Sequence, residues 1–166
     1  WDDAMSGEQL FTMLANNSFK QGADIYMAAG IYKVGTSSSD FVSVSSGVNI
    51  HGGYDPASTG YGTSISYPSS FETIISGDIN EDGIANQGDA LLMEVTTAIP
   101  VSFYGVTFKG GYIATATHSE ASGANLSVRS GINVLKVGAL NMNYCNIEGC
   151  ISDIGANSDA GGAALL

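Results

Sequence analysis

Positively charged side chains are scarce in this sequence. Of its 166 residues only 5 are Lys or Arg, against 16 Asp or Glu, so the formal net charge is −11 at pH 7. Proteins that bind nucleic acid hold the phosphate backbone with clustered Lys and Arg side chains. Here the basic residues are scattered between Lys20 and Lys136. The composition therefore predicts no nucleic-acid partner and an acidic surface that attracts cations.

Long apolar runs and cysteines are also few. No run of about eighteen apolar residues occurs, so the sequence predicts no transmembrane segment. The two cysteines, Cys145 and Cys150, are separated by about 17 Å of extended chain, which a disulfide spans only if the chain reverses tightly. We expect two small buried side chains instead. Hydrophobic residues make up 44% of the chain, which argues against disorder.

A single helix is predicted near the N-terminus. Ser6 and Gln9 have the spacing of an S-x-x-Q capping box. Apolar residues then recur at helical spacing, at positions 10, 11, 13 and 14. We expect an amphipathic helix over residues 7–16, placed to cover one end of whatever fold follows.

From residue 24 onward the apolar pattern changes to a period of two. Short alternating segments separated by Gly, Ser and Asn are typical of short β-strands. Such segments occur at 24–28, 41–44, 48–50, 73–75, 91–95, 101–103, 106–108, 132–135, 140–142 and 145–147. The sequence therefore predicts an all-β fold with one helix.

An internal repeat links two of these regions. Residues 101–111 (VSFYGVTFKGG) align without a gap on residues 140–150 (LNMNYCNIEGC), an offset of 140 − 101 = 39. Residues 48–53 resemble the first half of this unit. Apolar residues lie on both sides of each corner, which favours a chain that winds forward and stacks its strands in parallel.

The predicted fold is a right-handed parallel β-helix, a solenoid, in which residues 1–166 form one domain. The helix at 7–16 caps its N-terminal end, and residues 24–166 form coils with loop excursions near 55–70 and 117–130. The chain opens on Trp1 and ends on Leu166, and we expect it to be the N-terminal part of a longer protein. Open strand edges invite pairing, so we expect further coils or self-association at the C-terminal end.

Four segments resemble bacterial surface proteins with right-handed β-helix repeats, which belong to the pectin-lyase-like fold group. They are residues 24–32 (DIYMAAGIY), 47–54 (GVNIHGGY), 73–78 (TIISGD) and 104–111 (YGVTFKGG). Residues 154–164 are similar to the FxxN and GGAI repeats of polymorphic outer-membrane proteins, with Ile154 in place of Phe and Ala164 in place of Ile. The resemblance implies a secreted chain or one on the bacterial outer cell surface. It also implies adhesion, through glycans or through host or cell-surface proteins.

The same fold group contains polysaccharide lyases and glycosidases, so the resemblance also allows an enzyme. An inverting glycosidase needs two carboxylates about 6.5–9.5 Å apart, but the repeat strands carry Asn, Thr and Ser with the single acid Glu148. His51 and His118 are isolated in the sequence. The sequence favours a non-catalytic adhesin or glycan-contacting scaffold. The alternative is the N-terminal part of a polysaccharide lyase or glycoside hydrolase whose active site lies in later coils.

Residues 78–89 match the template of a calcium-binding loop. Alternate oxygen ligands and a central glycine at Gly83 let one chain segment surround an ion. The candidate ligands are Asp78, Asn80, Asp82, the carbonyl of Ile84, and Asp89, which replaces the usual final Glu. Two hypotheses stay open at this point, a calcium site and a solvated polar loop without metal.

Aromatic residues gather in and near the first excursion. Tyr54, Tyr61, Tyr67 and Phe71 lie in or beside residues 55–70, while Tyr104 and Tyr112 lie near corners. Aromatic faces can stack on sugar rings, but amphipathic tyrosines more commonly pack loops onto a protein body. We expect packing to be their main role.

Overall fold

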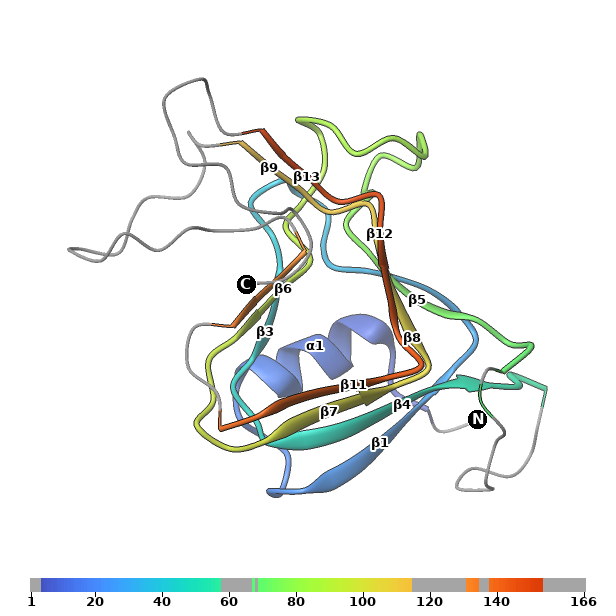
Figure 1. Ribbon diagram of the computed structural model, residues 1–166, viewed down its shortest axis with the longest axis vertical. Coiled ribbons are helices and arrows are strands. Elements are labelled where there is room, and N and C mark those ends of the chain that lie inside the picture. Colours follow the sequence, from blue (N-terminus) through green and yellow to red (C-terminus); the bar gives the residue numbers. More distant parts are fainter. Residues whose placement is uncertain (1–3, 58–66, 68, 115–130, 135–137, 154–166) are drawn as a thin grey trace.

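The computed structural model describes residues 4–57, 67, 69–114, 131–134 and 138–153. The predicted excursion at 117–130, the repeat-like stretch at 154–164 and His118 lie outside the described residues. Only part of the excursion at 55–70 falls within them. In the view of Figure 1 the strands run along the sides of an open ring, and the helix near the N-terminus falls inside its outline.

Helix α1 (Gly7–Ala15) begins at the capping box that the sequence predicts. The Ser6 hydroxyl accepts a hydrogen bond from the Gln9 amide at 3.2 Å, and the Ser6 amide donates to Gln9 Oε1 at 2.8 Å. This reciprocal capping box satisfies two of the amide groups that the first helical turn leaves free. Leu10, Phe11 and Leu14 form the buried face of the helix, as their spacing predicts.

The other elements within the described residues are short strands. They are β1 (Ala23–Ala28), β2 (Gly30–Lys33), β3 (Val42–Val44), β4 (Val48–Tyr54), β5 (Thr73–Ser76), β6 (Met93–Val95), β7 (Val101–Tyr104), β8 (Val106–Lys109), β9 (Tyr112–Ala114), β10 (Ile132–Val134), β11 (Leu140–Asn143), β12 (Asn146–Glu148) and β13 (Ile151–Asp153). Each predicted segment overlaps a strand, although several bounds differ by one or more residues, whereas β2, β9 and β13 were not predicted. The part of the chain that the structure describes is thus predominantly β with one helix.

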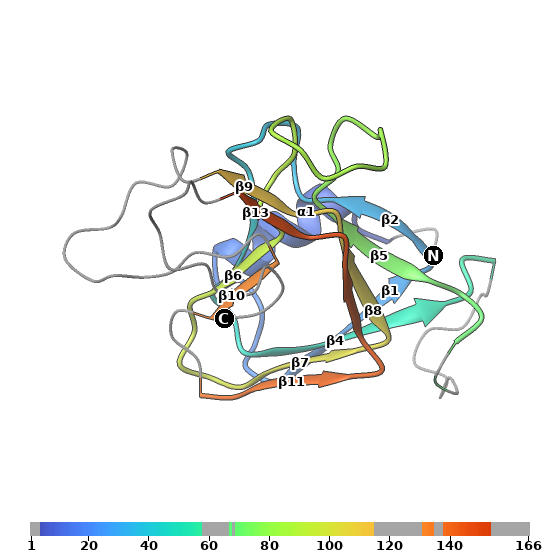
Figure 2. The ribbon, with the colours of Figure 1, turned by 45° about the horizontal axis from the view of Figure 1, so that its top comes forward.

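The strands form four sheets in which the pairing is parallel throughout. Sheet A has the order β1-β4-β7-β11, sheet B has β12-β8-β5-β2, sheet C has β10-β6-β3, and sheet D has β13-β9. The chain visits these sheets in a recurring order, from A to B to C and back to A, with sheet D inserted after B in the later passes. Figures 1 and 2 show the strands of each sheet lying one above another.

The register of the later strands follows the repeat found in the sequence. Leu140 pairs with Val101 in sheet A and Asn146 pairs with Thr107 in sheet B. Sheets C and D keep the same offset of 39, as in the pairs Ile132 with Met93 and Ile151 with Tyr112. The gapless alignment of residues 101–111 on 140–150 is therefore confirmed as a set of hydrogen-bonded ladders.

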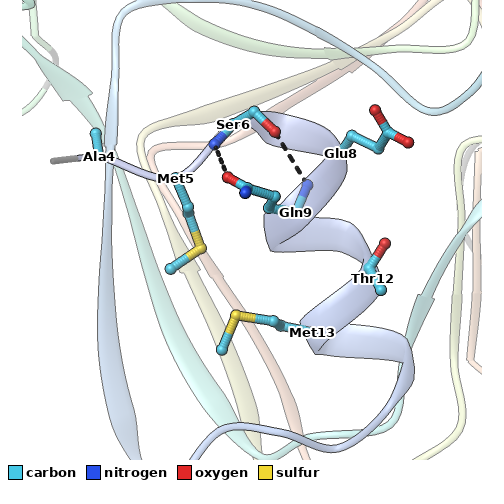
Figure 3. A pocket seen from close by; sticks show the side chains of 7 residues that line it. All are labelled: Ala4, Met5, Ser6, Glu8, Gln9, Thr12 and Met13. Atoms are coloured by element: carbon cyan, nitrogen blue, oxygen red, sulfur yellow. Dashed lines mark hydrogen bonds between the residues drawn. The ribbon is translucent and has the colours of Figure 1, made fainter.

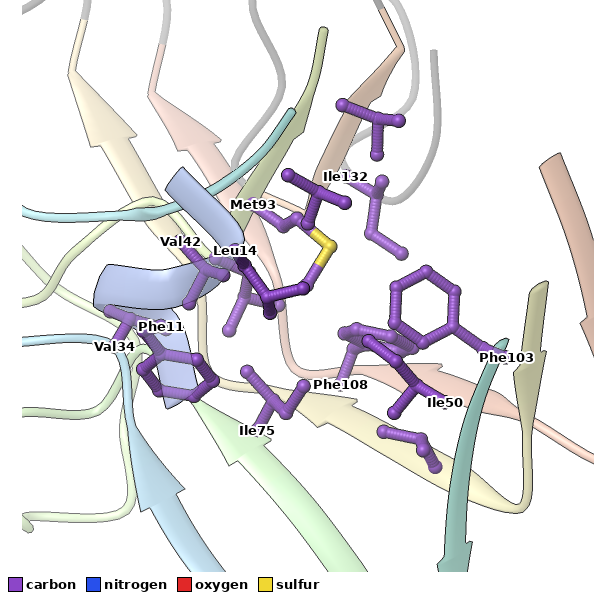
Figure 4. Close-up of a cluster of buried hydrophobic side chains, with 14 of the residues drawn as sticks. Phe11, Leu14, Val34, Val42, Ile50, Ile75, Met93, Phe103, Phe108 and Ile132 are labelled. Carbon is purple, nitrogen blue, oxygen red and sulfur yellow. The ribbon is translucent and has the colours of Figure 1, made fainter. Parts of the chain in front are cut away.

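The hydrophobic core lies between the sheets and is filled by side chains. Phe103 and Phe108 are fully buried, and their rings meet edge to face with centroids 5.2 Å apart. Figure 4 shows Leu14 and Phe11 of α1 reaching into the same cluster as Ile75. Because side chains alternate between the two faces of a strand, every second residue points into this interior. The interior is filled, so a ligand can bind only on the outer surface.

Helix α1 packs beside the first strands of the sheets. Its C-terminal carbonyls are capped by Ser45, whose hydroxyl lies 2.8 Å from the Leu14 oxygen and 2.6 Å from the Ala15 oxygen. Gly7 at its start lies against the Tyr32 ring of β2. Within the described residues, α1 is too short and too polar on one face to cross a membrane, and no other helix is present.

Candidate functional site

The predicted metal loop connects β5 to β6 and is closed at its base by backbone hydrogen bonds. The Ala90 amide donates to the Gly77 carbonyl at 3.0 Å, and the Gly77 amide donates to the Lys109 carbonyl of the neighbouring strand at 2.9 Å. A side chain at position 77 would place its Cβ 2.6 Å from the Ala90 oxygen. Glycine is therefore required where the two ends of the loop meet the sheet.

Three carboxylates converge inside this loop. Asp78, Asp82 and Asp89 each bring one oxygen to within 4.8 Å of the other two. Three negative charges at this separation repel one another unless a cation or hydrogen-bond donors lie between them. The structure therefore gathers the three acidic residues that the loop template singles out.

Asp78 is the carboxylate with an unused oxygen. Its Oδ2 accepts a hydrogen bond from the Gly83 amide at 2.9 Å, which folds the loop around the template's central glycine. Gly83 has φ of +77°, a conformation that favours glycine. The Asp78 Oδ1 atom is buried and has no hydrogen-bond partner among the described residues. Buried oxygens are rarely left without a partner, so this atom is available to a cation.

Asp89 is almost completely buried, at 1% exposure. Its Oδ1 accepts from the Ile79 amide at 3.2 Å, and its Oδ2 accepts from the Asn86 amide at 2.9 Å. Each carboxylate oxygen has more than one lone pair, so these bonds leave room for a metal ligand. The two amides fix the orientation of the Asp89 carboxylate at the inner wall of the loop.

The remaining predicted ligands lie in the outer part of the loop. The Asn80 side chain accepts from the Asp82 amide at 3.0 Å and donates to Asp82 Oδ2 at 3.2 Å. The Ile84 carbonyl accepts from the Asn86 side-chain amide at 2.8 Å, while the Ile84 side chain is 66% exposed. Asn80 thus lies beside the acidic cluster, and the Ile84 carbonyl is already bonded to a neighbour.

The sequence prediction did not include Asn86. Its side-chain amide also donates to Asp82 Oδ2 at 2.8 Å, and its Oδ1 accepts from the Gly88 amide at 2.8 Å. Asn86 occupies the ninth position when Asp78 is counted as the first, a position that the calcium-loop template often fills through a water molecule. That ninth position of the template is the sequence signal that points to Asn86.

A basic residue lies at the rim of the loop and not within it. The Lys33 ammonium pairs with Glu81, and it donates to the Ile79 carbonyl at 3.3 Å. The hydrogen bond from Lys33, together with its charge, holds the pKa of Glu81 below its usual value. Lys33 therefore neutralises Glu81 and leaves the three aspartates without a cationic partner among the described residues. Hard carboxylate and amide oxygens of this kind suit Ca²⁺ or Mg²⁺.

A row of aromatic rings follows the outer side of sheet A. The His51 ring lies between Tyr26, at a centroid distance of 5.3 Å, and Tyr104, at 4.7 Å. Its Nε2 is 3.2 Å from Asp24 Oδ1. The three rings belong to paired positions of β1, β4 and β7. His51 is thus part of a packed stack, and its two faces are covered by tyrosine.

Several tyrosines pack as the sequence suggested. Tyr54 is 5% exposed and lies edge-on to Tyr26 at 5.3 Å. The Tyr67 hydroxyl donates to the Gly52 carbonyl at 3.0 Å. Burial raises the pKa of Tyr54, and it raises the pKa of Tyr67 to about 12. These phenols stay protonated at neutral pH and can act as hydrogen-bond donors. Tyr61 lies outside the described residues.

A shallow depression lies on the outer face of α1 and is shown in Figure 3. The polar side chains of Ser6 and Gln9 in its wall are both engaged in the capping box. The apolar lining comes from Met5, which is 45% exposed, and Met13. Glu8 is its charged lining residue. This depression offers a ligand few directed polar groups, so the acidic loop is the stronger candidate site.

Comparison of the chain with known protein families, with curated proteins and with solved structures found no match.

Proposed function

We propose that this chain is a right-handed parallel β-helix that acts as a non-catalytic scaffold in adhesion or glycan contact. The observation that carries the proposal is the recurring order of the sheets with in-register parallel pairing. A chain that returns to the same sheet after each circuit forms a solenoid. Parallel crossovers are right-handed in about 98% of cases, which supports the handedness.

The packed interior supports a function on the outer surface. Core residues such as Phe103 and Val95 are 0% exposed, so the space between the sheets is occupied. Solenoids present long regular surfaces that suit extended ligands. The proposed setting is outside the cell, secreted or on the bacterial outer surface, in keeping with the resemblance noted in the sequence. The proposed partners are glycans or proteins of a host or cell surface.

We further propose that the loop between β5 and β6 binds Ca²⁺. Support comes from the three converging carboxylates and from the buried Asp78 oxygen that has no partner among the described residues. Asp78, Asp82 and Asp89 would hold the ion, with Asn80 beside them. The ion would balance the charge of the cluster and hold the excursion rigid between two passes of the chain. The role of the metal is structural.

A binding assay run together with a turnover assay tests the scaffold function. The purified chain is passed over immobilised neutral polysaccharides and over immobilised polygalacturonate. New reducing ends and unsaturated uronate products are measured in the same samples. We expect retention on a neutral glycan without release of products, because the repeat segments at 101–111 and 140–150 carry a single acidic residue, Glu148. The heat-denatured chain is the control for non-specific adsorption.

Two results would contradict this proposal. Time-dependent release of products that scales with the amount of protein would favour the alternative, the N-terminal part of a polysaccharide lyase or glycoside hydrolase. Absence of retention on every glycan tested would remove glycan contact from the proposed function.

A further inference from the structure

Tyr144 has an unusual backbone conformation for a large side chain. It lies at the corner between β11 and β12 with φ of +55°, and it is 69% exposed. The equivalent corner in the preceding pass, between β7 and β8, is Gly105 with φ of +62°. This left-handed conformation is strained for residues other than glycine. A tyrosine thus occupies a corner whose backbone conformation favours glycine, and its side chain faces solvent.

The ring of Tyr144 is supported from beneath. It stacks on Tyr67 with centroids 5.4 Å apart and planes inclined by 12°. The Tyr67 hydroxyl donates to the Gly52 carbonyl at 3.0 Å and lies 3.4 Å from the Tyr104 carbonyl. A Cβ at Gly105 would lie 2.1 Å from the Tyr67 ring, so glycine at that corner provides the space that Tyr67 occupies. The lower corner and the anchored ring together hold Tyr144 in place.

The stack leaves one side of the Tyr144 ring open. Tyr67 covers one face, and the 69% exposure of Tyr144 shows that most of the remaining surface is in water. His51 differs, because Tyr26 and Tyr104 lie on its two faces. Both faces of the His51 ring are therefore covered by tyrosines of the row on sheet A. Tyr144, in contrast, presents a flat apolar surface to a ligand.

Uncharged polar side chains lie on the two strands that meet at this corner. Asn141 and Asn143 lie on β11 and Asn146 lies on β12, and all three are exposed. Asn141 and Asn143 are two residues apart and so lie on the same face of their strand. A carboxamide offers both a donor and an acceptor, which matches the hydroxyl groups of a sugar.

The surrounding charges favour a neutral ligand. Residues 140–147 contain no charged side chain, and the next one along the chain, Glu148, pairs with Lys109 at 3.5 Å. The whole chain carries a net charge of −11. An anionic glycan would meet repulsion here and would find no unpaired cation in this segment to hold its carboxylates.

We propose that Tyr144, supported by Tyr67 and with Asn141, Asn143 and Asn146 on the two adjoining strands, binds a pyranose ring of a neutral glycan. The apolar face of the sugar packs on the open side of the Tyr144 ring, and the carboxamides bond its hydroxyl groups. This inference rests on the proposed function in glycan contact and assigns its site. Sites for small ligands combine aromatic surfaces with a few directed polar groups, and this corner supplies both.

The test uses Tyr144→Gly, which removes the ring and installs the residue found at the equivalent corner. Because glycine relieves the backbone strain at φ of +55°, the variant is expected to unfold at a temperature no lower than the parent chain. Binding of cellohexaose, xylohexaose and mannohexaose is measured by titration calorimetry. For the sugar that the parent chain binds, we expect the affinity to fall at least about tenfold in Tyr144→Gly.

Three further variants make the test specific. Tyr144→Phe keeps the aromatic face and should bind within about threefold of the parent chain. Asn143→Ala should weaken binding by an intermediate factor. Ile31→Ala removes a large apolar side chain that is 68% exposed on β2, the strand at the opposite edge of sheet B from β12, and should leave the affinity unchanged.

The outcomes separate this inference from the proposed function. If the parent chain binds a neutral oligosaccharide and Tyr144→Gly binds it equally well, the site assignment is overturned and glycan contact stands. If the parent chain binds oligogalacturonate in preference to every neutral sugar, the assignment to a neutral ligand is overturned. If the parent chain binds no sugar at all, the site and the proposed glycan contact both fail.

Discussion

Single residues decide how closely successive passes of the chain can approach each other. At Gly52 a Cβ would lie 2.6 Å from the Gly105 carbonyl, and at Gly77 it would lie 2.9 Å from the Gly111 Cα. Strands of one sheet are spaced at about 4.8 Å, so corners that touch backbone to backbone have no space for a side chain. The high glycine content, 22 residues, is explained in part by such contacts.

The two cysteines illustrate the effect of partial burial on a single group. Cys145 and Cys150 are both free thiols of intermediate exposure, so the expected small buried side chains are found only partly buried. Desolvation by burial raises the pKa of both thiols, and the charge of Glu148 adds to the effect at Cys150. Backbone hydrogen bonds oppose the shift at each site.

This shift predicts slow alkylation that depends on pH. The thiolate is the reactive form, and a raised pKa lowers its fraction at pH 8. We expect iodoacetamide to modify Cys145 and Cys150 several-fold more slowly in the folded chain than in the chain unfolded in urea, with the folded rate rising as the pH passes the raised pKa. The unfolded state loses its thiol protons first, so the contribution of these groups to stability is present below about pH 8.5 and declines above it.

The measurement is the rate of mass gain at a series of pH values. A Cys145→Ser chain isolates the reaction of Cys150. Equal rates in the folded and unfolded chains at pH 8 would contradict the shift.

At the scale of elements, helix α1 and the acidic loop form through interactions between residues that are close in sequence. The capping box and the apolar face account for α1 without reference to the rest of the fold. In the loop, the bonds from Gly83 to Asp78 and from Ile84 to Asp82 join residues at most five positions apart. Such short-range bonds follow directly from the spacing of Asp and Asn residues.

The loop predicts that calcium stabilises the protein. With Ca²⁺ at about 100 times its dissociation constant, binding to the folded state adds about 2.7 kcal/mol to the free energy of unfolding. For a chain of this size that corresponds to a rise in melting temperature of roughly 5–11 °C. We expect this rise when calcium replaces EDTA, measured by circular dichroism or calorimetry.

Two variants distinguish metal binding from a general effect of charge. Asp78→Asn removes one carboxylate of the cluster and should abolish the difference between calcium and EDTA. Glu81→Gln removes a negative charge from the same loop, but Glu81 pairs with Lys33 and lies outside the cluster, so this control should keep the difference. A parent chain with the same melting temperature in calcium and in EDTA would show that the loop is a solvated turn without metal.

At the scale of the whole molecule, the passes of the chain share one interior. Val101, Phe103, Val106 and Phe108 are each 0% exposed, whereas their partners in the next pass are only partly buried. Those partners are Leu140, Met142, Cys145 and Ile147. The sequence patterns of the two passes are alike, so their difference in burial comes from position in the stack.

This difference predicts unequal effects of two substitutions at paired positions. Phe103→Ala removes a fully buried ring that packs on Phe108, and should lower the free energy of unfolding by about 3–5 kcal/mol. Met142→Ala, at the position paired with Phe103, should cost about 1–2 kcal/mol because its side chain is only partly buried. Urea unfolding measures both values. Equal losses would mean that the two passes are equally buried in solution.

The sequence by itself determined the features that depend on spacing along the chain. These are the position of α1, most of the short strands, the offset of 39 between paired passes, and the set of aspartates in the loop. The physical reason is that capping, alternation and turn formation act between residues a few positions apart. The strands β2, β9 and β13 were not predicted because each is separated from the preceding strand by only one or two residues and begins at or just after a glycine, and a glycine there indicates the end of a strand.

Only the tertiary structure decided which distant side chains meet. Tyr67 supports Tyr144, and His51 lies between Tyr26 and Tyr104, because separate passes of the chain are stacked in a particular register. Asp78 likewise lies against Gly110 of the next pass, where an added Cβ would be 3.1 Å from the Asp78 Cβ. Contacts of this kind depend on how loops of different length return the chain to each sheet, and spacing along the sequence does not reveal that geometry.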